Sequence, residues 1–283
     1  MSFSSSVMSV LEKLNDQESD KNYILKYNMK FVGIIPARYA STRFPGKPLA
    51  MLGGKPVIQR VYEQVKECFD ELYVATDDDR IREAVLAFGG NVVMTSEDCK
   101  NGTERCLDAY KRLGLECDVI VNIQGDEPFI QPKQIQALVS CFDSDETDIA
   151  TLVKPFEPAD GLERLECPNS PKVVLNEDGY ALYFSRSVVP FLRGVEKDKW
   201  LENHTFYKHL GIYAYRAELL EKITVLPQSP MEKAESLEQL RWLENGYRIR
   251  VGITDIETIG IDTPEDLERA REFAASIGFE WND

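Results

Sequence analysis

Three cations stand close together in one short loop of the chain. Arg38, Arg43 and Lys47 lie in the segment Ala37-Arg-Tyr-Ala-Ser-Thr-Arg-Phe-Pro-Gly-Lys47. The small residues among them let the backbone approach a ligand and leave N–H groups free to point at it. Guanidinium and ammonium groups bind phosphate oxygens strongly. The loop therefore predicts a site for a small anion, and a polyphosphate suits the number of cations.

The charge distribution supports an anion site. The chain has 33 Lys and Arg against 48 Asp and Glu, a formal net charge of −15. Residues 21–62 nevertheless hold eight cations and no acid, where an even spread would place about seven acids. The alternative is a solvated basic face without a ligand. Nucleic acid is not favoured as a partner, because the overall acidity repels a long phosphate backbone more than a small anion in one pocket.

Two carboxylates form the second candidate group. Asp126 lies in the turn Gln124-Gly-Asp-Glu-Pro128, and Asp262 directly precedes Thr263-Pro264, where a helix should begin. Two hard oxygen ligands combined with phosphate oxygens suit Mg²⁺, which usually takes few protein ligands. The alternatives are structural: Asp126 is a turn residue, and Asp262 extends a helix cap.

Alternating strands and helices must position these groups. Short apolar runs predict strands over residues 31–35, 72–76, 91–95 and 118–123. We expect Pro36 to end the first strand ladder, because proline has no N–H to donate. Helices are predicted after each strand: from Val57, from the Asp77–Asp79 caps to Phe88, from Gly102 to Gly114, and from Pro132 to Phe142. This alternation predicts a mostly parallel sheet, whose ligands bind beyond the carboxyl ends of the strands.

The pattern becomes antiparallel in the second half. A strand over 149–153, a hairpin over 172–185 and a strand over 209–215 predict an inserted antiparallel β region at about residues 170–215. Ser229-Pro-Met-Glu232 predicts a capping box that opens a helix running to about Glu244, followed by a strand over 247–252. We expect a single α/β domain over residues 29–283.

Several global features limit the class of protein. Residues 1–28 lack the apolar region of a signal peptide. We expect either that the true start is Met29, with the preceding segment disordered or mis-annotated, or that the segment is a genuine N-terminal extension. The six cysteines form no C-x-x-C pair and predict reduced thiols and a cytoplasmic protein. Only two histidines are present, which excludes a His-rich zinc site, and no apolar run is long enough to span a bilayer.

The cationic loop carries a family resemblance. The segment Ile34–Pro48 resembles the N-terminal signature of 3-deoxy-manno-octulosonate (Kdo) cytidylyltransferases, the CMP-Kdo synthetases of Gram-negative bacteria. The resemblance extends from Met29 to about Phe273. Two loop segments depart from the family pattern, Lys100-Asn101 and Pro168–Pro171, and neither changes the polar residues named below. Seven further blocks match in the same order: Tyr73–Asp77, Gly102–Arg105, Val121–Pro128, Tyr180–Arg186, His209–Tyr213, Leu237–Arg241 and Gly260–Leu267.

The resemblance implies a doubly wound sheet of the nucleotide-diphospho-sugar transferase type and assigns roles to residues. Lys47, Arg38 and Asp126 would be catalytic, and Asp126 and Asp262 would bind Mg²⁺. The residues that it places at the CTP nucleotide are Pro36, Ala37, Arg38, Arg43, Lys47, Arg105 and Gln124. The residues that it places at the sugar acid are Arg186, His209, Tyr213, Glu238 and Gln239. A lone strand histidine is more often a packing residue, so His209 depends on the resemblance alone.

The implied reaction transfers a cytidylyl group from CTP to the anomeric hydroxyl of Kdo, for lipopolysaccharide synthesis. Such transfers need positioning and charge neutralisation more than covalent help. The family is homodimeric, and the inserted β region is where we expect the partner subunit. Two other readings remain open: a sibling nucleotidyltransferase that activates another acidic sugar, and a nucleotide-binding protein without turnover. Intact Lys47, Asp126 and Asp262 argue against the latter.

Overall fold

The structure is a computed structural model, and it describes residues 29–256 and 259–276. Their contacts group them into two compact units. Unit 1 contains residues 29–117, 122–135 and 259–276, and unit 2 contains residues 118–121 and 136–256. The expectation of a single domain stays a prediction, and the predictions for residues 1–28 lie outside the described residues.

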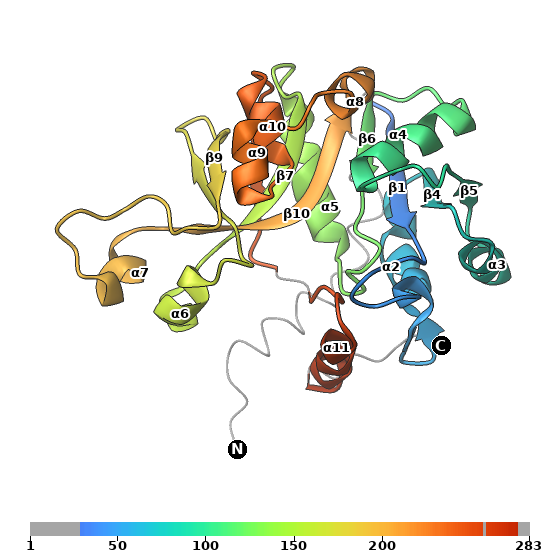
Figure 1. The fold of residues 1–283 in the computed structure, drawn as a ribbon, viewed down its shortest axis with the longest axis horizontal. Helices are drawn as coiled ribbons and strands as arrows, with labels where there is room; N and C mark the ends of the chain where they lie inside the picture. The colour runs from blue at the N-terminus through green and yellow to red at the C-terminus, as the bar shows by residue number, and fades with distance from the viewer. Residues whose placement is uncertain (1–28, 257–258, 277–283) are drawn as a thin grey trace. The chain divides into compact units, whose positions relative to one another are not determined.

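Unit 1 is built on a parallel sheet. Its strands β1 (Phe31–Ala37), β4 (Glu71–Thr76) and β5 (Val92–Met94) pair in that order (Figure 1). The short strands β2 (Met51–Leu52) and β3 (Lys55–Pro56) form a separate antiparallel pair. The helical elements are η2 (Lys47–Leu49), α2 (Val57–Val65), η3 (Lys66–Cys68), α3 (Asp79–Ala87), α4 (Gly102–Leu113) and α11 (Pro264–Ser276), with the start of α5 (Pro132–Val139).

The prediction that Pro36 ends the first ladder is wrong. Strand β1 continues to Ala37, and Pro36 lies opposite Ala75 of β4. The backbone direction explains why proline is tolerated here. The carbonyl of Ile34 accepts the N–H of Ile123, at 2.9 Å, on the side away from β4. Residue 36 shares the direction of residue 34, so its missing N–H is not required by β4.

The helix boundaries predicted in unit 1 are confirmed where caps define them. The side chain of Asp78 accepts the N–H of Arg80 and begins α3, and Asn101 accepts the N–H of Glu104 and begins α4. Gly114 closes α4 with φ at 62°, a left-handed conformation that favours glycine. These caps set where each helix meets the carboxyl end of the preceding strand.

Unit 2 is built on strands β6 (Val119–Asn122), β7 (Ile149–Pro155), β8 (Lys172–Leu175), β9 (Ala181–Ser185), β10 (Tyr207–Arg216) and β11 (Ile249–Ile253). Their sheet is mixed and includes the order β11-β7-β10-β6. Strands β11 and β7 are parallel, β10 is antiparallel to β7 and β8, and β8 forms the predicted hairpin with β9. The expected α/β class with a mostly parallel sheet and an inserted antiparallel region is confirmed. The helical elements after α5 are η4 (Ser140–Asp143), η5 (Pro158–Asp160), α6 (Gly161–Glu166), η6 (Lys197–Lys199), α7 (Trp200–Asn203), α8 (Ala217–Thr224), α9 (Pro230–Glu235) and α10 (Gln239–Glu244).

The prediction of one helix from Ser229 to about Glu244 is wrong. The capping box of Ser229 and Glu232 is present, but α9 ends at Glu235. Ser236 then adopts a left-handed conformation with φ at 52°, and the helix resumes as α10 at Gln239. A left-handed residue breaks the run of i to i−4 hydrogen bonds, so the chain turns between the two helices.

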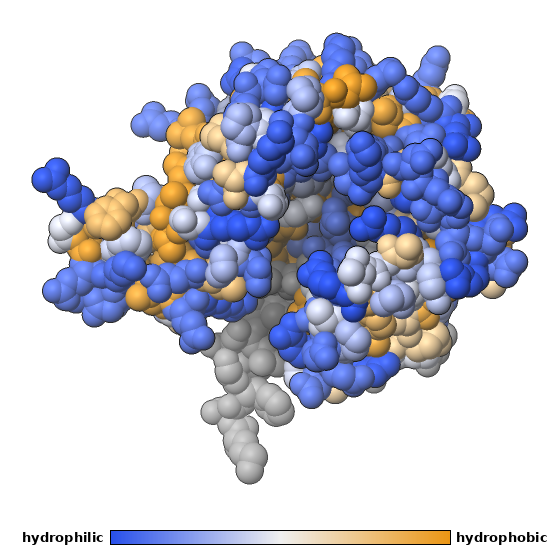
Figure 2. Space-filling model, viewed as in Figure 1, coloured by the Kyte–Doolittle hydropathy of each residue, from blue (hydrophilic) through white to orange (hydrophobic). Residues whose placement is uncertain are grey.

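The visible face of the molecule is mainly polar. The face drawn in Figure 2 is covered mainly by hydrophilic residues, with apolar residues in small groups. In the described part of the chain, no helix has both the length and the apolar character needed to cross a bilayer. All six cysteines are free thiols.

Candidate active site

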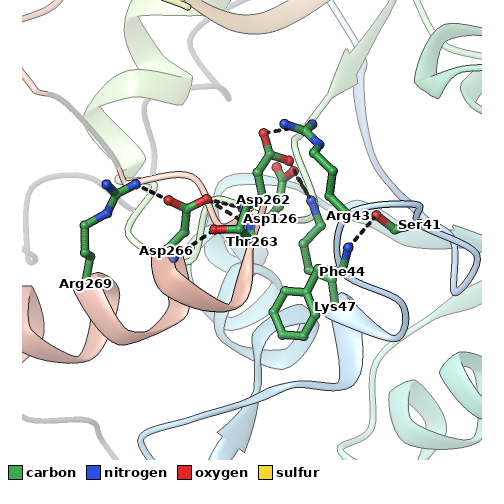
Figure 3. A network of polar contacts seen from close by, with 9 residues as sticks. All are labelled: Ser41, Arg43, Phe44, Lys47, Asp126, Asp262, Thr263, Asp266 and Arg269. Atoms are coloured by element: carbon green, nitrogen blue, oxygen red, sulfur yellow. Dashed lines mark hydrogen bonds and ion pairs between the residues drawn. The ribbon is translucent and has the colours of Figure 1, made fainter.

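Lys47 lies between two carboxylates in unit 1. Its Nζ is 2.6 Å from Oδ2 of Asp126 and 3.2 Å from Oδ1 of Asp262. Nη2 of Arg43 is 3.1 Å from the other oxygen of Asp262. Figure 3 shows these four side chains converging from three separate segments of the chain. Two of the three loop cations, Arg43 and Lys47, therefore form one cluster with the two acids that the sequence singled out.

The end of the cationic loop fixes Lys47. Gly46 has φ at 73°, and its N–H donates to the carbonyl of Tyr39 at 2.9 Å. Lys47 then begins the short η2 helix, with its own N–H bonded to the carbonyl of Phe44. Because the backbone is held on both sides, only 14% of the Lys47 side chain is exposed and its ammonium is directed at the two acids.

Close packing of backbone positions Asp126. A Cβ built on Gly125 would lie 2.8 Å from the carbonyl oxygen of Pro36, a distance that real Cβ atoms essentially never show. The turn can therefore approach β1 this closely only with glycine at residue 125. This approach brings Asp126 to the end of the strand from which the cationic loop starts.

We expect Gly125→Ala to destabilise the protein by about 1–3 kcal/mol, because the added methyl group meets backbone that cannot move aside. Urea unfolding of both variants measures the effect. Gly260→Ala is the matched control: Gly260 lies two residues from Asp262, and its added Cβ meets nothing within 4 Å. Equal stability of the two variants would contradict the close approach.

The backbone also brings Asp262 to Asp126. The N–H of Ile261 donates to the carbonyl of Asp126 at 2.9 Å. The cap of α11 is formed by other residues: Thr263 Oγ1 accepts the N–H of Asp266, and Asp266 Oδ2 accepts the N–H groups of Asp262 and Thr263. Burial works against the charged form of Asp266, yet these backbone donors hold its pKa below the usual value. The side chain of Asp262 is therefore not the cap and is directed at Lys47 and Arg43.

The two carboxylates of the cluster can bind a cation between them. Two carboxylates already share one positive charge, the ammonium of Lys47, and a divalent ion suits the same pair of hard oxygen ligands. No group of three or more His, Cys, Asp or Glu side chains suited to a metal occurs in residues 29–256 and 259–276. A metal ion at these two acids would therefore complete its coordination with ligand or water oxygens, as Mg²⁺ commonly does.

The remaining residues predicted at the nucleotide fall into two groups. Arg38 is exposed directly after β1, and Pro36 and Ala37 end that strand. Gln124 is half-buried two residues before Asp126. Arg105 is 3% exposed: it donates to Thr95 Oγ1 at 2.6 Å and to Asp77 Oδ2 at 2.7 Å. Its guanidinium thus ties α4 to the ends of β4 and β5, and its contact with nucleotide stays a prediction.

His209 is held by β7 in unit 2. The hydroxyl of Thr151 donates to the carbonyl of Ile212 at 2.7 Å, so its oxygen must accept the hydrogen bond from His209 Nε2 at 3.0 Å. This assigns the proton to Nε2 and leaves Nδ1 as the acceptor. Phe184 and Tyr213 pack against the ring. Burial lowers the pKa of His209 to about 3, so the ring is neutral.

The pKa of His209 predicts a loss of stability at mildly acidic pH. The unfolded chain binds the proton near pH 6.5 and the folded protein only near pH 3, so stability falls as the pH drops through this window. Between pH 7 and 5 the expected loss of unfolding free energy is about 2 kcal/mol. We expect His209→Gln to remove this loss and His204→Gln, at the exposed histidine, to retain it in urea unfolding. An unchanged pH dependence in His209→Gln would contradict the assignment.

Three buried donors of unit 2 have no partner in the described part of the protein: Tyr213 OH, Gln239 Nε2 and Trp242 Nε1. The rings of Tyr213 and Trp242 meet edge to face, with centroids 5.2 Å apart. Burial raises the pKa of Tyr213 well above its ordinary value. Each unsatisfied buried donor is costly unless a ligand or water accepts from it. Glu238, which precedes Gln239, lies 3.2 Å from Arg241.

Arg186 holds the break between α9 and α10. Its guanidinium donates to the backbone carbonyls of Glu235, Pro168 and Ser236, at 2.6, 2.9 and 3.3 Å. Its own N–H donates to the Glu235 carboxylate at 2.9 Å. In this structure Arg186 therefore fixes the start of the segment that carries Glu238, and its contact with a sugar acid stays a prediction.

Sequence reasoning missed partners that only the fold brings close. Asp77 appeared to be one of three capping acids, yet it pairs with buried Arg105. Trp242 is absent from the residues that the sequence singled out. Its unpartnered N–H has no sequence signal.

A parallel sheet whose strand ends carry a cationic loop and a pair of carboxylates is the arrangement of an α/β nucleotidyltransferase. A profile of the cytidylyltransferase family matches residues 32–253. The chain therefore belongs to the cytidylyltransferase family.

Relatives within the family are more specific. The chain is 68% identical over 245 residues to the 3-deoxy-manno-octulosonate cytidylyltransferase of Phocaeicola vulgatus, covering 87% of this chain and 97% of that protein. It is 44% identical over 247 residues to the mitochondrial enzyme of that name from Arabidopsis thaliana, covering 86% and 83%. A solved structure of CMP:2-keto-3-deoxy-manno-octonic acid synthetase complexed with CTP matches with 42% identity and a TM-score of 0.79, covering 87% of this chain and 99% of that one.

Proposed function

We propose that this enzyme transfers the cytidylyl group of CTP to the anomeric hydroxyl of Kdo, releasing pyrophosphate and forming CMP-Kdo for lipopolysaccharide synthesis. The observation that carries the proposal is the cluster in which Lys47 bridges Asp126 and Asp262, with Arg43 beside it. The identity of the nucleotide base and of the sugar acid is inferred from the relatives.

The loop cations act on the triphosphate. The attacking hydroxyl displaces pyrophosphate from the α-phosphorus, and negative charge grows on the leaving group. Arg38 and Lys47, at the two ends of the loop, stabilise that charge, and Arg43 adds a third cation from its exposed position. No dedicated general base is required by this arrangement, because positioning and charge neutralisation supply most of the catalysis.

Asp126 and Asp262 are proposed to hold Mg²⁺. When bound, the ion neutralises phosphate charge and lowers the pKa of a nearby hydroxyl. The two acids also act without it: they orient the ammonium of Lys47 in the ligand-free protein, at 2.6 and 3.2 Å. Lys47 must share or leave these carboxylates to reach a phosphate.

Residues of unit 2 are proposed to bind the sugar acid. Kdo carries a carboxylate and several hydroxyls, which accept hydrogen bonds. Tyr213 OH and Gln239 Nε2 are buried donors that need such acceptors. Neutral His209 offers Nδ1 as an acceptor to a hydroxyl, because Nε2 already donates to Thr151.

A pyrophosphate-release assay tests the proposal directly. The purified protein is incubated with CTP, UTP, GTP or ATP, each crossed with Kdo and with sialic acid, in the presence of Mg²⁺. We expect turnover with CTP and Kdo to exceed every other combination. Preference for another sugar acid would favour a sibling nucleotidyltransferase, and tight CTP binding without turnover would favour a binding protein.

We further propose a homodimer in the cytoplasm. The proposed dimer rests on the region around α6 and α7. There Phe156, Leu165, Trp200 and Phe206 form a separate apolar cluster, and Phe191 packs on Trp200 while 71% exposed. Sedimentation equilibrium of the wild type and of Phe191→Ser measures whether this exposed ring supports a dimer.

A further inference from the structure

The carbonyl of Tyr39 closes the cationic loop. It accepts the N–H of Ser41 at 3.0 Å and the N–H of Gly46 at 2.9 Å. Arg38 directly precedes this closing point, and Lys47 directly follows Gly46. The position of Tyr39 therefore decides how close the cations at the two ends of the loop lie to each other.

The ring of Tyr39 is held by two neighbours. A Cβ built on Gly46 would lie 3.1 Å from two ring carbons and from the hydroxyl oxygen of Tyr39, so the loop backbone packs directly on the phenol. The guanidinium carbon of Arg80 lies 3.3 Å from the ring centroid. This distance is well inside the range in which a cation is attracted to an aromatic face.

Arg80 is itself fixed at the start of α3. Its Nε and Nη2 donate to the two carboxylate oxygens of Asp78, at 2.9 and 2.6 Å. Asp78 is also the cap of α3, since it accepts the N–H of Arg80 at 2.9 Å. The hydrogen bond from Arg80 holds the pKa of Asp78 below its usual value. The guanidinium is thus presented to Tyr39 by a helix terminus and not by a freely rotating side chain.

The contact joins the ends of two adjacent strands. Tyr39 follows β1 and Asp78 follows β4, and the last residues of these strands, Ala37 and Thr76, lie opposite each other in the parallel register. The cationic loop is therefore anchored to the neighbouring strand end at the edge of the sheet where ligands bind.

We propose that Tyr39 and Arg80 are positioning residues that hold the cationic loop closed, so that Arg38, Arg43 and Lys47 act together on a polyphosphate. The proposal takes the identity of the substrate from the function proposed above, but it concerns only the binding of phosphate groups. A preformed loop loses less conformational freedom on binding and therefore binds more tightly.

The test measures binding of inorganic pyrophosphate and of CTP by calorimetry, together with the KM for CTP and for Kdo. A cation–π contact at an exposed site changes an equilibrium about two- to fivefold. We expect Arg80→Ala to weaken pyrophosphate and CTP binding by about that factor, with the KM for Kdo and kcat nearly unchanged. Tyr39→Ala should have a larger effect, about tenfold, and Tyr39→Phe, which keeps the ring, should stay close to wild type.

The control is Arg82→Ala. Arg82 lies on the same helix and pairs with Asp79 at 3.0 Å, so its loss should leave phosphate binding unchanged. The double variant Arg80→Ala with Tyr39→Ala should bind no more weakly than Tyr39→Ala alone, which a general loss of stability would not produce.

The outcomes separate this inference from the proposed function. Pyrophosphate binding by Arg80→Ala equal to that of Arg82→Ala would overturn the positioning role, even if wild-type enzyme makes CMP-Kdo. Absence of turnover with CTP and Kdo would overturn the proposed function, while weakened pyrophosphate binding in Arg80→Ala would still support the positioning role. A wild-type protein that binds neither pyrophosphate nor CTP would overturn both.

Discussion

Replacement of Lys47 by alanine is expected to lower kcat by about 10²–10³-fold, because one preorganised charge that stabilises the leaving pyrophosphate is removed. A second effect adds to the loss. Asp126 and Asp262 share the ammonium of Lys47, and without it two like charges face each other across the site. Steady-state pyrophosphate release with CTP and Kdo measures the change.

Lys55→Ala is the matched control for this prediction. Lys55 belongs to the same acid-free stretch, but its Nζ lies 3.3 Å from Glu63, away from the two aspartates. Its loss removes one positive charge from the same stretch and leaves the contacts of Lys47 with Asp126 and Asp262 in place, so we expect kcat to stay within about twofold. Turnover of Lys47→Ala close to that of Lys55→Ala would remove Lys47 from the mechanism.

The members of the site in unit 1 could be predicted from the sequence because each depends on local rules. A buried strand followed by a loop of small residues and cations, and an aspartate just before Thr263-Pro264, are visible within a few residues of chain. Their convergence follows from the fold, since loops after parallel strands share one edge. The hydrogen bond from Ile261 to Asp126, which joins the two acids, has no local signal.

What could not be predicted depends on tertiary contacts. The left-handed Ser236 breaks a segment whose local pattern favours one helix, and the carbonyls of Glu235 and Ser236 are held there by Arg186, from β9's end. Pro36 stays in its strand because its nitrogen is not directed at β4. Likewise, Arg105 pairs with Asp77, which lies far away in the sequence. Arg80 contacts the ring of Tyr39, also far away in the sequence, from a position that the cap of α3 fixes.

Asp126→Asn is expected to abolish Mg²⁺-dependent turnover while the protein stays folded. The amide keeps the shape of the side chain but removes one of the two charges that would hold the ion. It also leaves Asp262 as the one carboxylate of this pair that still binds the ammonium of Lys47. Pyrophosphate release as a function of Mg²⁺ concentration measures the loss, and thermal unfolding checks the fold.

Binding of Mn²⁺ to the free protein, followed by electron paramagnetic resonance, separates a metal role from other effects on turnover. We expect Asp126→Asn to bind Mn²⁺ more weakly than wild type. Asp79→Asn, at an exposed acid that pairs with Arg82, should bind Mn²⁺ as wild type does. Lys47→Ala should bind it more tightly in the absence of nucleotide, because the ammonium no longer competes for the two carboxylates. Full activity in Asp126→Asn, or Mn²⁺ affinity that is the same in all three variants, would refute the metal site and leave Lys47 as the functional cation between the acids.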